Sequence, residues 1–516
     1  MNFFSISSNI LVNIVGMAFV TLLTFIATPY YLLYLGTEAF GLIGFFYVFC
    51  VCISILDLGV SPFLQREVAK TTNKNFINED FNKIVQIITI YFIFILIFIN
   101  ILSLPLSGLI INNWFTTDGW DLLPLVEVEQ SIKLIFSISS LLMGVNLFKY
   151  GLTGYHFHYW LNIFLTFTAI LRYVGSILLI SIYKGNIVDF FIYQVLIALV
   201  ELIVLAIKFY SQVPTKLLVL KNINITLLKK IFSETIKIST ISILLIIAYQ
   251  LDKVLLSKVI PLEEYAYFTL ISIICSGIML ISIPVKRAIQ PTFSILHLSK
   301  NLSQSIDLYR RASHLITIIV GAIVITICMY PIPIILFWTG NLEVSMWVSD
   351  SLYLFVIGAG LASIQSILLA FQEARGDLNL QIKLNFIFLL VQVPLMLFCV
   401  LYFGIVFKEP VIGIGLAWLA IRISSFIILT NLIHKTYELN LNKKWFLKDF
   451  FLVILIQVIV SLILKNYLSD EILTSLEHPI LGVLFAGFII IMSGFLSSHH
   501  LYRYIKNYKL IKNNTN

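Results

Sequence analysis

The chain has 516 residues, of which 59% are hydrophobic and 12% are charged, whereas about 25% of the residues of a soluble domain are charged. This composition excludes a soluble globular protein and predicts an all-α polytopic membrane protein. The net charge of +8 would suggest nucleic acid for a soluble protein, but basic residues in the loops of a membrane protein set its orientation, so we expect no nucleic-acid partner.

Fourteen apolar runs of spanning length follow one another along the chain, separated by loops with charged, Pro, Gly or Asn residues. They lie at about 9–30, 41–64, 84–104, 132–153, 161–182, 187–207, 237–258, 265–285, 313–337, 350–371, 381–404, 411–433, 448–465 and 480–500. The first run is not preceded by the basic residues of a signal peptide, so we expect it to stay in the protein as the first span.

The basic residues support this count of spans. Of the 34 Lys and Arg residues, 26 lie in the even-numbered connections or the C-terminal tail, and the odd-numbered connections hold only Lys184, Lys258, Lys408 and Lys465. Cytoplasmic loops are enriched in Lys and Arg. The distribution therefore predicts that both termini are cytoplasmic.

The two halves of the chain repeat one another with an offset of about 225 residues. The first span leads through YLGTEAFGL (34–42) into the second, and the seventh leads through VIPLEEYAYF (259–268) into the eighth. Helix-breaking residues occur near the end of the second span, at Gly59 and Pro62, and near the end of the equivalent eighth span, at Pro284 and Pro291. Matched interruptions of this kind indicate a substrate path in transporters, although Pro also closes helices at the membrane interface.

The repeat predicts the domain organisation. We expect two pseudo-symmetric six-helix bundles that enter the membrane from the same side, followed by two additional helices. The regions are an N-terminal bundle at 1–210, a cytoplasmic linker at 211–236, a C-terminal bundle at 237–434, and the additional helices with a cytoplasmic tail at 435–516.

Polar side chains gather on one face of two equivalent spans at helical spacing. The stripes are Asn9, Asn13, Gly16 and Thr24 in the first span, and Ser239, Ser242, Gln250, Lys253 and Ser257 in the seventh. We expect the two faces to line a central cavity, with Asn13, Gln250 and Lys253 as cavity residues. Polar residues of these types also serve as ordinary contacts between helices.

Among the charged residues within the apolar runs, six are candidates for a functional or pairing role: Asp57, Arg172, Glu201, Asp252, Lys253 and Arg422. Each charge at the bilayer centre costs about 2.5–3.5 kcal/mol on insertion scales, so such residues face a partner or a wet cavity. Asp252 points about 100° around the helix from Lys253. We expect Lys253 to face the cavity and Asp252 to pair with a cation such as Arg172; the alternative is that both charges only hold helices together.

The basic residues Lys253, Arg172 and Arg422 favour an anionic cargo that carries phosphate, because Arg forms forked hydrogen bonds with phosphate and Lys acts as a point charge. The glycines Gly36 and Gly41 have the spacing of a P-loop but lack its Lys and Ser/Thr. The five cysteines have no metal-ligand spacing. We therefore expect no catalytic residue, no metal and no cofactor.

Several stretches resemble a known family. NIVGMAFVTLLTFIATPYYLLYLGTEAFGL (13–42) and ILDLGVSPFLQREVAK (55–70) resemble the start of Wzx-type O-antigen and polysaccharide flippases. These flippases form the polysaccharide-transport branch of the multidrug/oligosaccharidyl-lipid/polysaccharide exporter superfamily. DKVLLSKVIPLEEYAYF (252–268) and FQEARGDLNLQ (371–381) resemble two of the family's turns more weakly.

The resemblance implies a MATE-like fold, alternating access, and a polyprenyl-diphosphate-linked oligosaccharide as cargo. Such cargo crosses from the inner to the outer leaflet of the bacterial inner membrane. In this superfamily the first, second, seventh and eighth spans line the cavity, which carries over to Asn13, Asp57 and Lys253. Relatives that flip peptidoglycan precursor tend to carry arginines in the first span, and the first span here has no charge.

Two other functions are alternatives. A cation-coupled multidrug exporter of the same superfamily would need carboxylates to dominate the cavity. The charged candidates here are of both signs, and those assigned to the cavity are basic. A membrane-bound polysaccharide polymerase or ligase would need catalytic groups in an outer loop, and the longest, about 105–131, has no basic residue to hold a diphosphate. The sequence leaves open whether Asp57, Glu201 or Asp252 binds a proton or Na⁺, and whether glycan polymerase partners bind.

Overall fold

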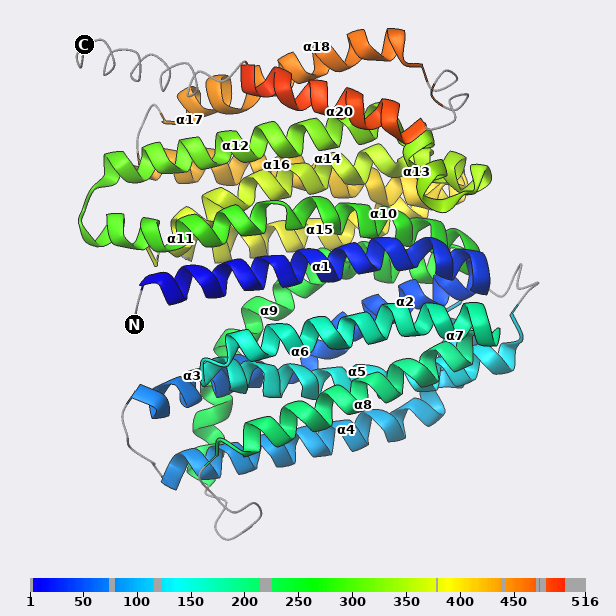
Figure 1. Cartoon of the computed structure of the whole chain (residues 1–516), viewed down its shortest axis with the longest axis vertical. Coiled ribbons are helices and arrows are strands. Elements are labelled where there is room, and N and C mark those ends of the chain that lie inside the picture. Colours follow the sequence, from blue (N-terminus) through cyan, green and yellow to red (C-terminus); the bar gives the residue numbers. More distant parts are fainter. Residues whose placement is uncertain are drawn as a thin grey trace. The chain divides into compact units, whose positions relative to one another are not determined.

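The computed structural model describes residues 3–73, 79–115, 123–213, 225–376, 379–437, 441–469, 473 and 479–496. The regular elements in these ranges are all helices, as Figure 1 shows. The prediction of an all-α protein is therefore confirmed.

Thirteen helices in the described part of the chain are long and apolar enough to cross a bilayer. Each overlaps one of the fourteen predicted spans. The remaining predicted span, 237–258, falls within helix α9 (Ile225–Val259), several of whose side chains lie outside the described residues. The count of about fourteen spans is consistent with the structure, and the chain is a multi-pass membrane protein.

The chain forms two compact units, and the first is Met1–Ala266. Its helical elements are α1 (Phe3–Leu35), α2 (Thr37–Ile53), η1 (Ser54–Asp57), α3 (Val60–Asn73), α4 (Glu79–Asn113), α5 (Leu125–Gly154), α6 (His158–Ile170), η2 (Leu171–Gly175), α7 (Ser176–Tyr183), α8 (Ile187–Tyr210), α9 and the first turn of α10 (Leu262–Leu280). Helix α9 packs against α2, η1 and α3. The division therefore falls one helix later than the expected linker at 211–236, of which residues 214–224 lie outside the described part.

The second unit is Tyr267–Asn516. It contains the rest of α10, α11 (Ser282–Leu298), α12 (Leu302–Met329), α13 (Pro331–Thr339), α14 (Leu342–Glu373), α15 (Asn379–Val406), α16 (Pro410–Tyr437), α17 (Leu441–Lys444), η3 (Trp445–Phe451), α18 (Leu452–Tyr467) and α20 (Pro479–Leu496). Helices α18 and α20 pack against each other and against α12. The two additional helices thus belong to the second unit.

One predicted span is divided in the structure. The run 313–337 predicts a single helix, but α12 ends at Met329 and α13 begins at Pro331. Proline has no N–H and disfavours helical geometry in the residue before it. Tyr330 accordingly leaves the helix, with φ −129° and ψ 50°.

Both predicted helix interruptions are present. In the first unit the second span breaks after η1, where Leu58 and Gly59 have φ of 47° and 75°. In the second unit α10 ends at Leu280 and α11 begins at Ser282. Pro62 and Pro284 lie in the first turn of the helix that follows each break, where a missing N–H costs no hydrogen bond. The second interruption is weaker than the first, because Ile281 keeps helical φ and ψ of −59° and −35°, and Pro291 lies inside α11.

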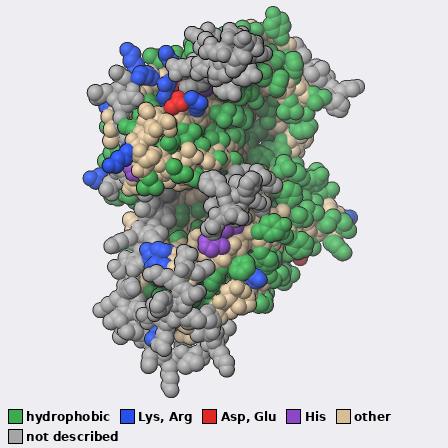
Figure 2. All heavy atoms as spheres, turned by 60° about the vertical axis from the view of Figure 1, so that its left-hand side comes forward, with side chains coloured by type: hydrophobic (Ala, Val, Ile, Leu, Met, Phe, Trp, Pro, Cys, Tyr) green, Lys and Arg blue, Asp and Glu red, His purple; other side chains and the backbone are tan. Residues whose placement is uncertain are grey.

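The outer surface of the described helices is strongly apolar. Leu33, Phe98 and Ile405 are 74%, 49% and 78% exposed, and Figure 2 shows hydrophobic side chains over a large part of the visible face. Exposed apolar area on this scale is unfavourable in water. It is the surface expected of helices that face lipid.

Candidate functional site

Arg172 lies in the π-helical segment η2, within the fifth span. Its Nη1 donates to Gln194 Oε1 at 2.9 Å and its Nη2 donates to Glu201 Oε2 at 2.8 Å, both on α8. Glu201 is 5% exposed. The ion pair neutralises two charges inside the first unit, so each offsets the cost of burying the other.

Side chains of α8 also support the π-helical turn. The Tyr193 hydroxyl donates to the Leu171 carbonyl at 2.8 Å, and Gln194 Nε2 donates to the Arg172 carbonyl at 3.4 Å. A Cβ atom at Gly175 would lie 2.0 Å from the Tyr193 hydroxyl, so a larger residue there would displace it. π-Helical turns occur frequently at functional sites, and this one directs Arg172 toward α8.

The polar face of α1 packs against the same region. Thr24 Oγ1 donates to the Tyr173 hydroxyl at 2.9 Å, and the hydroxyls of Tyr31 and Ser176 are 2.6 Å apart. A Cβ atom at Gly16 would lie 3.7 Å from Asn162 Oδ1 of α6. Gly16 and Thr24 of the predicted stripe therefore pack within the first unit, while the side chains of Asn9 and Asn13 lie outside the described residues.

Asp57 has a structural role at the break in the second span. Its carboxylate accepts from the Ser61 backbone N–H at 3.2 Å and from the Ser61 hydroxyl at 2.6 Å. These bonds satisfy a donor at the start of α3, as a capping residue does. On α4, the Tyr91 hydroxyl donates to the Leu56 carbonyl at 2.7 Å. The motif LDLGVSP thus forms a helix interruption in which polar groups before and after the break make hydrogen bonds.

Lys253 and Asp252 lie together on α9. The Lys253 Nζ donates to the Tyr249 carbonyl at 2.8 Å and is 3.5 Å from Asp252 Oδ1. The Asp252 residue is 3% exposed and the Lys253 side chain is 19% exposed. Gln250 is half-buried on the same helix. Lys253 therefore keeps a partly accessible ammonium group beside a buried carboxylate.

The expected pair between Asp252 and Arg172 is wrong. Arg172 is held by Glu201 and Gln194, because η2 faces α8, and the ion contact of Asp252 is with Lys253. Both charges lie where the sequence predicts them, but the partner of each differs from the expected one.

Arg422 belongs to the second unit, whereas the other seven candidate residues belong to the first. Its guanidinium carbon is 4.0 Å from the centre of the Trp418 ring, one turn earlier on α16. Gly358 of α14 leaves room for the stack, since a Cβ there would be 2.7 Å from Trp418 Nε1. Cation–π stacking of this kind stabilises a partly buried Arg. Among the described residues, no three of His, Cys, Asp and Glu are placed to hold a metal ion.

The two turns that the repeat singled out meet within the first unit. A Cβ atom at Gly41 would lie 2.1 Å from the Leu262 carbonyl oxygen, so α2 and the start of α10 are in direct contact. Thr37 Oγ1 donates to Glu263 Oε1 at 3.4 Å, and Glu38 Oε2 accepts from the Leu123 N–H at 2.9 Å. The motif YLGTEAFGL thus has a packing role, which the sequence alone did not reveal.

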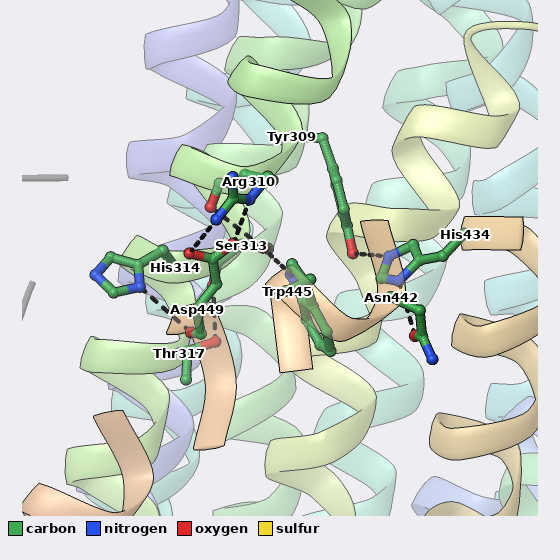
Figure 3. Close-up of polar contacts among 9 residues, drawn as sticks. All are labelled: Tyr309, Arg310, Ser313, His314, Thr317, His434, Asn442, Trp445 and Asp449. Carbon is green, nitrogen blue, oxygen red and sulfur yellow. Dashed lines mark hydrogen bonds and ion pairs between the residues drawn. The ribbon is translucent and has the colours of Figure 1, made fainter. Parts of the chain in front are cut away.

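A second polar cluster, whose residues are not among the predicted site residues, lies in the second unit (Figure 3). Arg310 of α12 donates to Asp449 of η3 through Nε at 2.6 Å and Nη2 at 3.2 Å. Asp449 has no solvent exposure. The predicted spans place Arg310 in a loop and Asp449 at the start of the run 448–465, so neither stands out as a member of a buried pair. The cluster joins the additional helices to α12.

The sequence profile of one family, described as polysaccharide biosynthesis protein, matches residues 6–297 of the chain. No curated protein matches the chain by sequence.

Several solved structures share the fold. The lipid II flippase MurJ in an inward closed conformation is 17% identical with a TM-score of 0.70, and the match covers 95% of this chain and 98% of that one. An inward-facing multidrug resistance MATE family transporter of the MOP superfamily is 15% identical with a TM-score of 0.65, over 80% of this chain and 94% of that one. The MATE multidrug transporter DinF-BH is 14% identical with a TM-score of 0.59, over 83% and 95%. The predicted MATE-like fold is therefore confirmed.

Proposed function

The chain belongs to the polysaccharide biosynthesis protein family, and we propose that it is a flippase for a polyprenyl-diphosphate-linked oligosaccharide. The cargo moves from the cytoplasmic to the periplasmic leaflet of the bacterial inner membrane by alternating access, with both termini of the protein in the cytoplasm. The observation that carries this proposal is the family match to a chain whose described part contains thirteen helices long and apolar enough to cross a membrane. A polysaccharide biosynthesis protein of this architecture has little room for a catalytic domain outside the membrane.

Lys253 is the best candidate for the diphosphate. Its ammonium group is partly accessible, and its contact with Asp252 is long at 3.5 Å. Its hydrogen bond of 2.8 Å to the Tyr249 carbonyl uses one of its three N–H donors. Arg172, by contrast, already makes two short hydrogen bonds to α8, so a phosphate would have to displace Glu201 or Gln194. Charge-assisted hydrogen bonds to phosphate are strong where water is scarce.

Asp252 is the best candidate for coupling to a proton or Na⁺. The carboxylates of Asp57 and Glu201 each accept a hydrogen bond of 2.8 Å or less from a partner with a clear structural role. Asp252 is buried and its ion contact with Lys253 is the longer one. A buried carboxylate with a weakly held cation can exchange that partner for an ion during a transport cycle.

Replacing Lys253 with alanine is expected to reduce the rate of translocation about tenfold to a hundredfold, since a hydrogen bond to a charged group contributes about 1.5–3 kcal/mol. Lys253→Arg should retain more activity because it keeps the charge. The control is Lys70→Ala, which removes a side chain that is 59% exposed. If Lys253→Ala transports like the parent protein, the residue does not contact cargo.

The polymerase or ligase alternative receives little support from the outer loop. Helix α4 continues to Asn113 and α5 begins at Leu125, which leaves a short connection. Glu127 and Glu129 lie on α5 itself, and Glu129 pairs with Lys133 at 2.7 Å. Asp118 and Asp121 of the same connection lie outside the described residues. We expect replacement of all four carboxylates by the corresponding amides to leave polysaccharide export unchanged.

Reconstitution of the purified protein into vesicles tests the flippase proposal. The vesicles contain a labelled polyprenyl-diphosphate oligosaccharide, and its appearance in the opposite leaflet is measured. We expect translocation that requires both the glycan and the diphosphate. Ion-driven movement of organic cations without lipid translocation would instead assign the protein to multidrug export, a function named for two transporters of this fold.

A further inference from the structure

One side of the segment formed by α17 and η3 is buried against the second unit. Leu441, Trp445 and Asp449 are 1%, 2% and 0% exposed and follow one another at intervals of four residues. Asp449 receives two hydrogen bonds from Arg310. Paired hydrogen bonds between Arg and a carboxylate fix direction as well as distance.

Further contacts hold the same side of the segment (Figure 3). Trp445 Nε1 donates to Ser313 Oγ at 2.6 Å. His434 of α16 lies 2.8 Å from the Tyr309 hydroxyl through Nε2 and 3.1 Å from Asn442 Oδ1 through Nδ1. The segment is thus attached to both α12 and α16, and it cannot rotate about its own axis without breaking these bonds.

The opposite side of the segment is exposed and carries both basic and apolar side chains. Lys443 and Lys444 are exposed near its start, and Lys448 is exposed between Leu447 and Phe451. Leu447 and Phe451 are 52% and 55% exposed. The apolar side chains continue along α18 with Leu455 and Ile459, which are 40% and 48% exposed. Two positive charges therefore precede an exposed apolar strip that runs into a membrane span, and the third lies among the first residues of that strip.

We propose that Lys443, Lys444 and Lys448 form a binding site for the phosphate headgroup of an anionic bilayer phospholipid. The acyl chains lie along the apolar strip of Leu447, Phe451 and the exposed face of α18. Clusters of basic residues next to a membrane span bind anionic lipids, and lysines extend their ammonium groups to the headgroup level. The adjoining apolar strip favours a lipid over free phosphate, which has no part that would contact it.

Binding is measured with the full-length protein in vesicles of phosphatidylcholine that contain increasing fractions of phosphatidylglycerol. The readout is the amount of phosphatidylglycerol that remains bound to the protein, compared with phosphatidylcholine, by native mass spectrometry. The test variant is K443Q/K444Q/K448Q. The control variant, K70Q/K149Q/K300Q, removes the same total charge from exposed lysines elsewhere. No oligosaccharide is present, so the result is independent of the proposed transport function.

The test variant is expected to lose preference for phosphatidylglycerol by about tenfold to a hundredfold, because each basic residue near an anionic surface contributes about fivefold. The control should change by less than about fivefold, the contribution of a single such residue. Equal losses in both variants would show that total charge governs binding and would overturn the site. An unchanged test variant, or displacement of phosphatidylglycerol by inorganic phosphate alone, would also overturn it.

Discussion

Arg172→Ala is expected to lower the free energy of unfolding by about 3–5 kcal/mol, which is the cost of breaking a buried ion pair by removing one partner. Glu201 is 5% exposed, and its carboxylate would lose the Nη2 donor at 2.8 Å. Gln194 would lose a second hydrogen bond. The effect should appear as a lower thermal midpoint of the purified protein and as less protein in the membrane.

A double variant separates the ion pair from other effects of the substitution. Arg172→Met with Glu201→Leu should be far more stable than Arg172→Ala, because apolar replacement of both partners of a buried pair is often neutral. The control is Arg66→Ala in the same unit, whose pair with Glu67 is long at 3.6 Å and whose side chain is 45% exposed. That change should cost about 0–1 kcal/mol. A double variant as unstable as the single one would mean that the pair does not stabilise the unit.

This result would differ from what the sequence predicts for Arg172. A cavity residue that only contacts cargo can be removed at normal membrane levels, and the sequence alone predicts that Arg172→Ala behaves in that way. The structure gives Arg172 two partners on α8, which makes it part of the helix packing. Transport by the stable double variant would then decide whether the charge also serves the cargo.

The spans could be predicted because each requires about twenty apolar residues and a polar loop, which are local properties of the chain. The partners of the charges could not, because hydropathy does not specify which helices pack together. Arg172 and Glu201 did offer a signal: they lie in consecutive spans, 29 residues apart, on either side of a short turn. Opposite charges placed in this way on neighbouring helices favour pairing.

The Arg310–Asp449 pair shows a second limit of sequence reasoning. Apolar runs mark the membrane-embedded part of a helix and miss the turns beyond it. Helix α12 begins at Leu302, well before the predicted run at 313, so Arg310 lies on a helix rather than in a loop. The α17–η3 segment likewise extends the thirteenth span toward Leu441. Both partners therefore lie on ordered helices at or just beyond the edges of the apolar runs.

Gly41→Ala is expected to disturb the contact between α2 and the first turn of α10. The new Cβ would lie 2.1 Å from the Leu262 carbonyl oxygen, which is a backbone atom and cannot move aside by rotating a side chain. Inserting a methyl group into a packed site costs about 1–3 kcal/mol, and occasionally more. We expect a lower thermal midpoint together with weakened transport.

Gly108→Ala is the matched control for this prediction. No heavy atom lies within 4 Å of a Cβ at Gly108, which is also in a membrane-spanning helix. Alanine favours a helix over glycine by about 1 kcal/mol, so this variant should be as stable as the parent or more stable. Equal behaviour of the two variants would show that the close approach at Gly41 does not constrain the protein.

The position of Gly41 makes this comparison informative about the transport cycle. Gly41 follows the turn of the first repeat, and Leu262 lies in the equivalent turn of the second. If cargo leaves on the side of these turns, as the proposed function requires, the contact between them has to open in each cycle. Gly41→Ala would then raise the energy of the closed state more than that of the open state. A variant that accumulates in the open state, measured by labelling of a cysteine introduced at Thr37, would link the packing of the motif to transport.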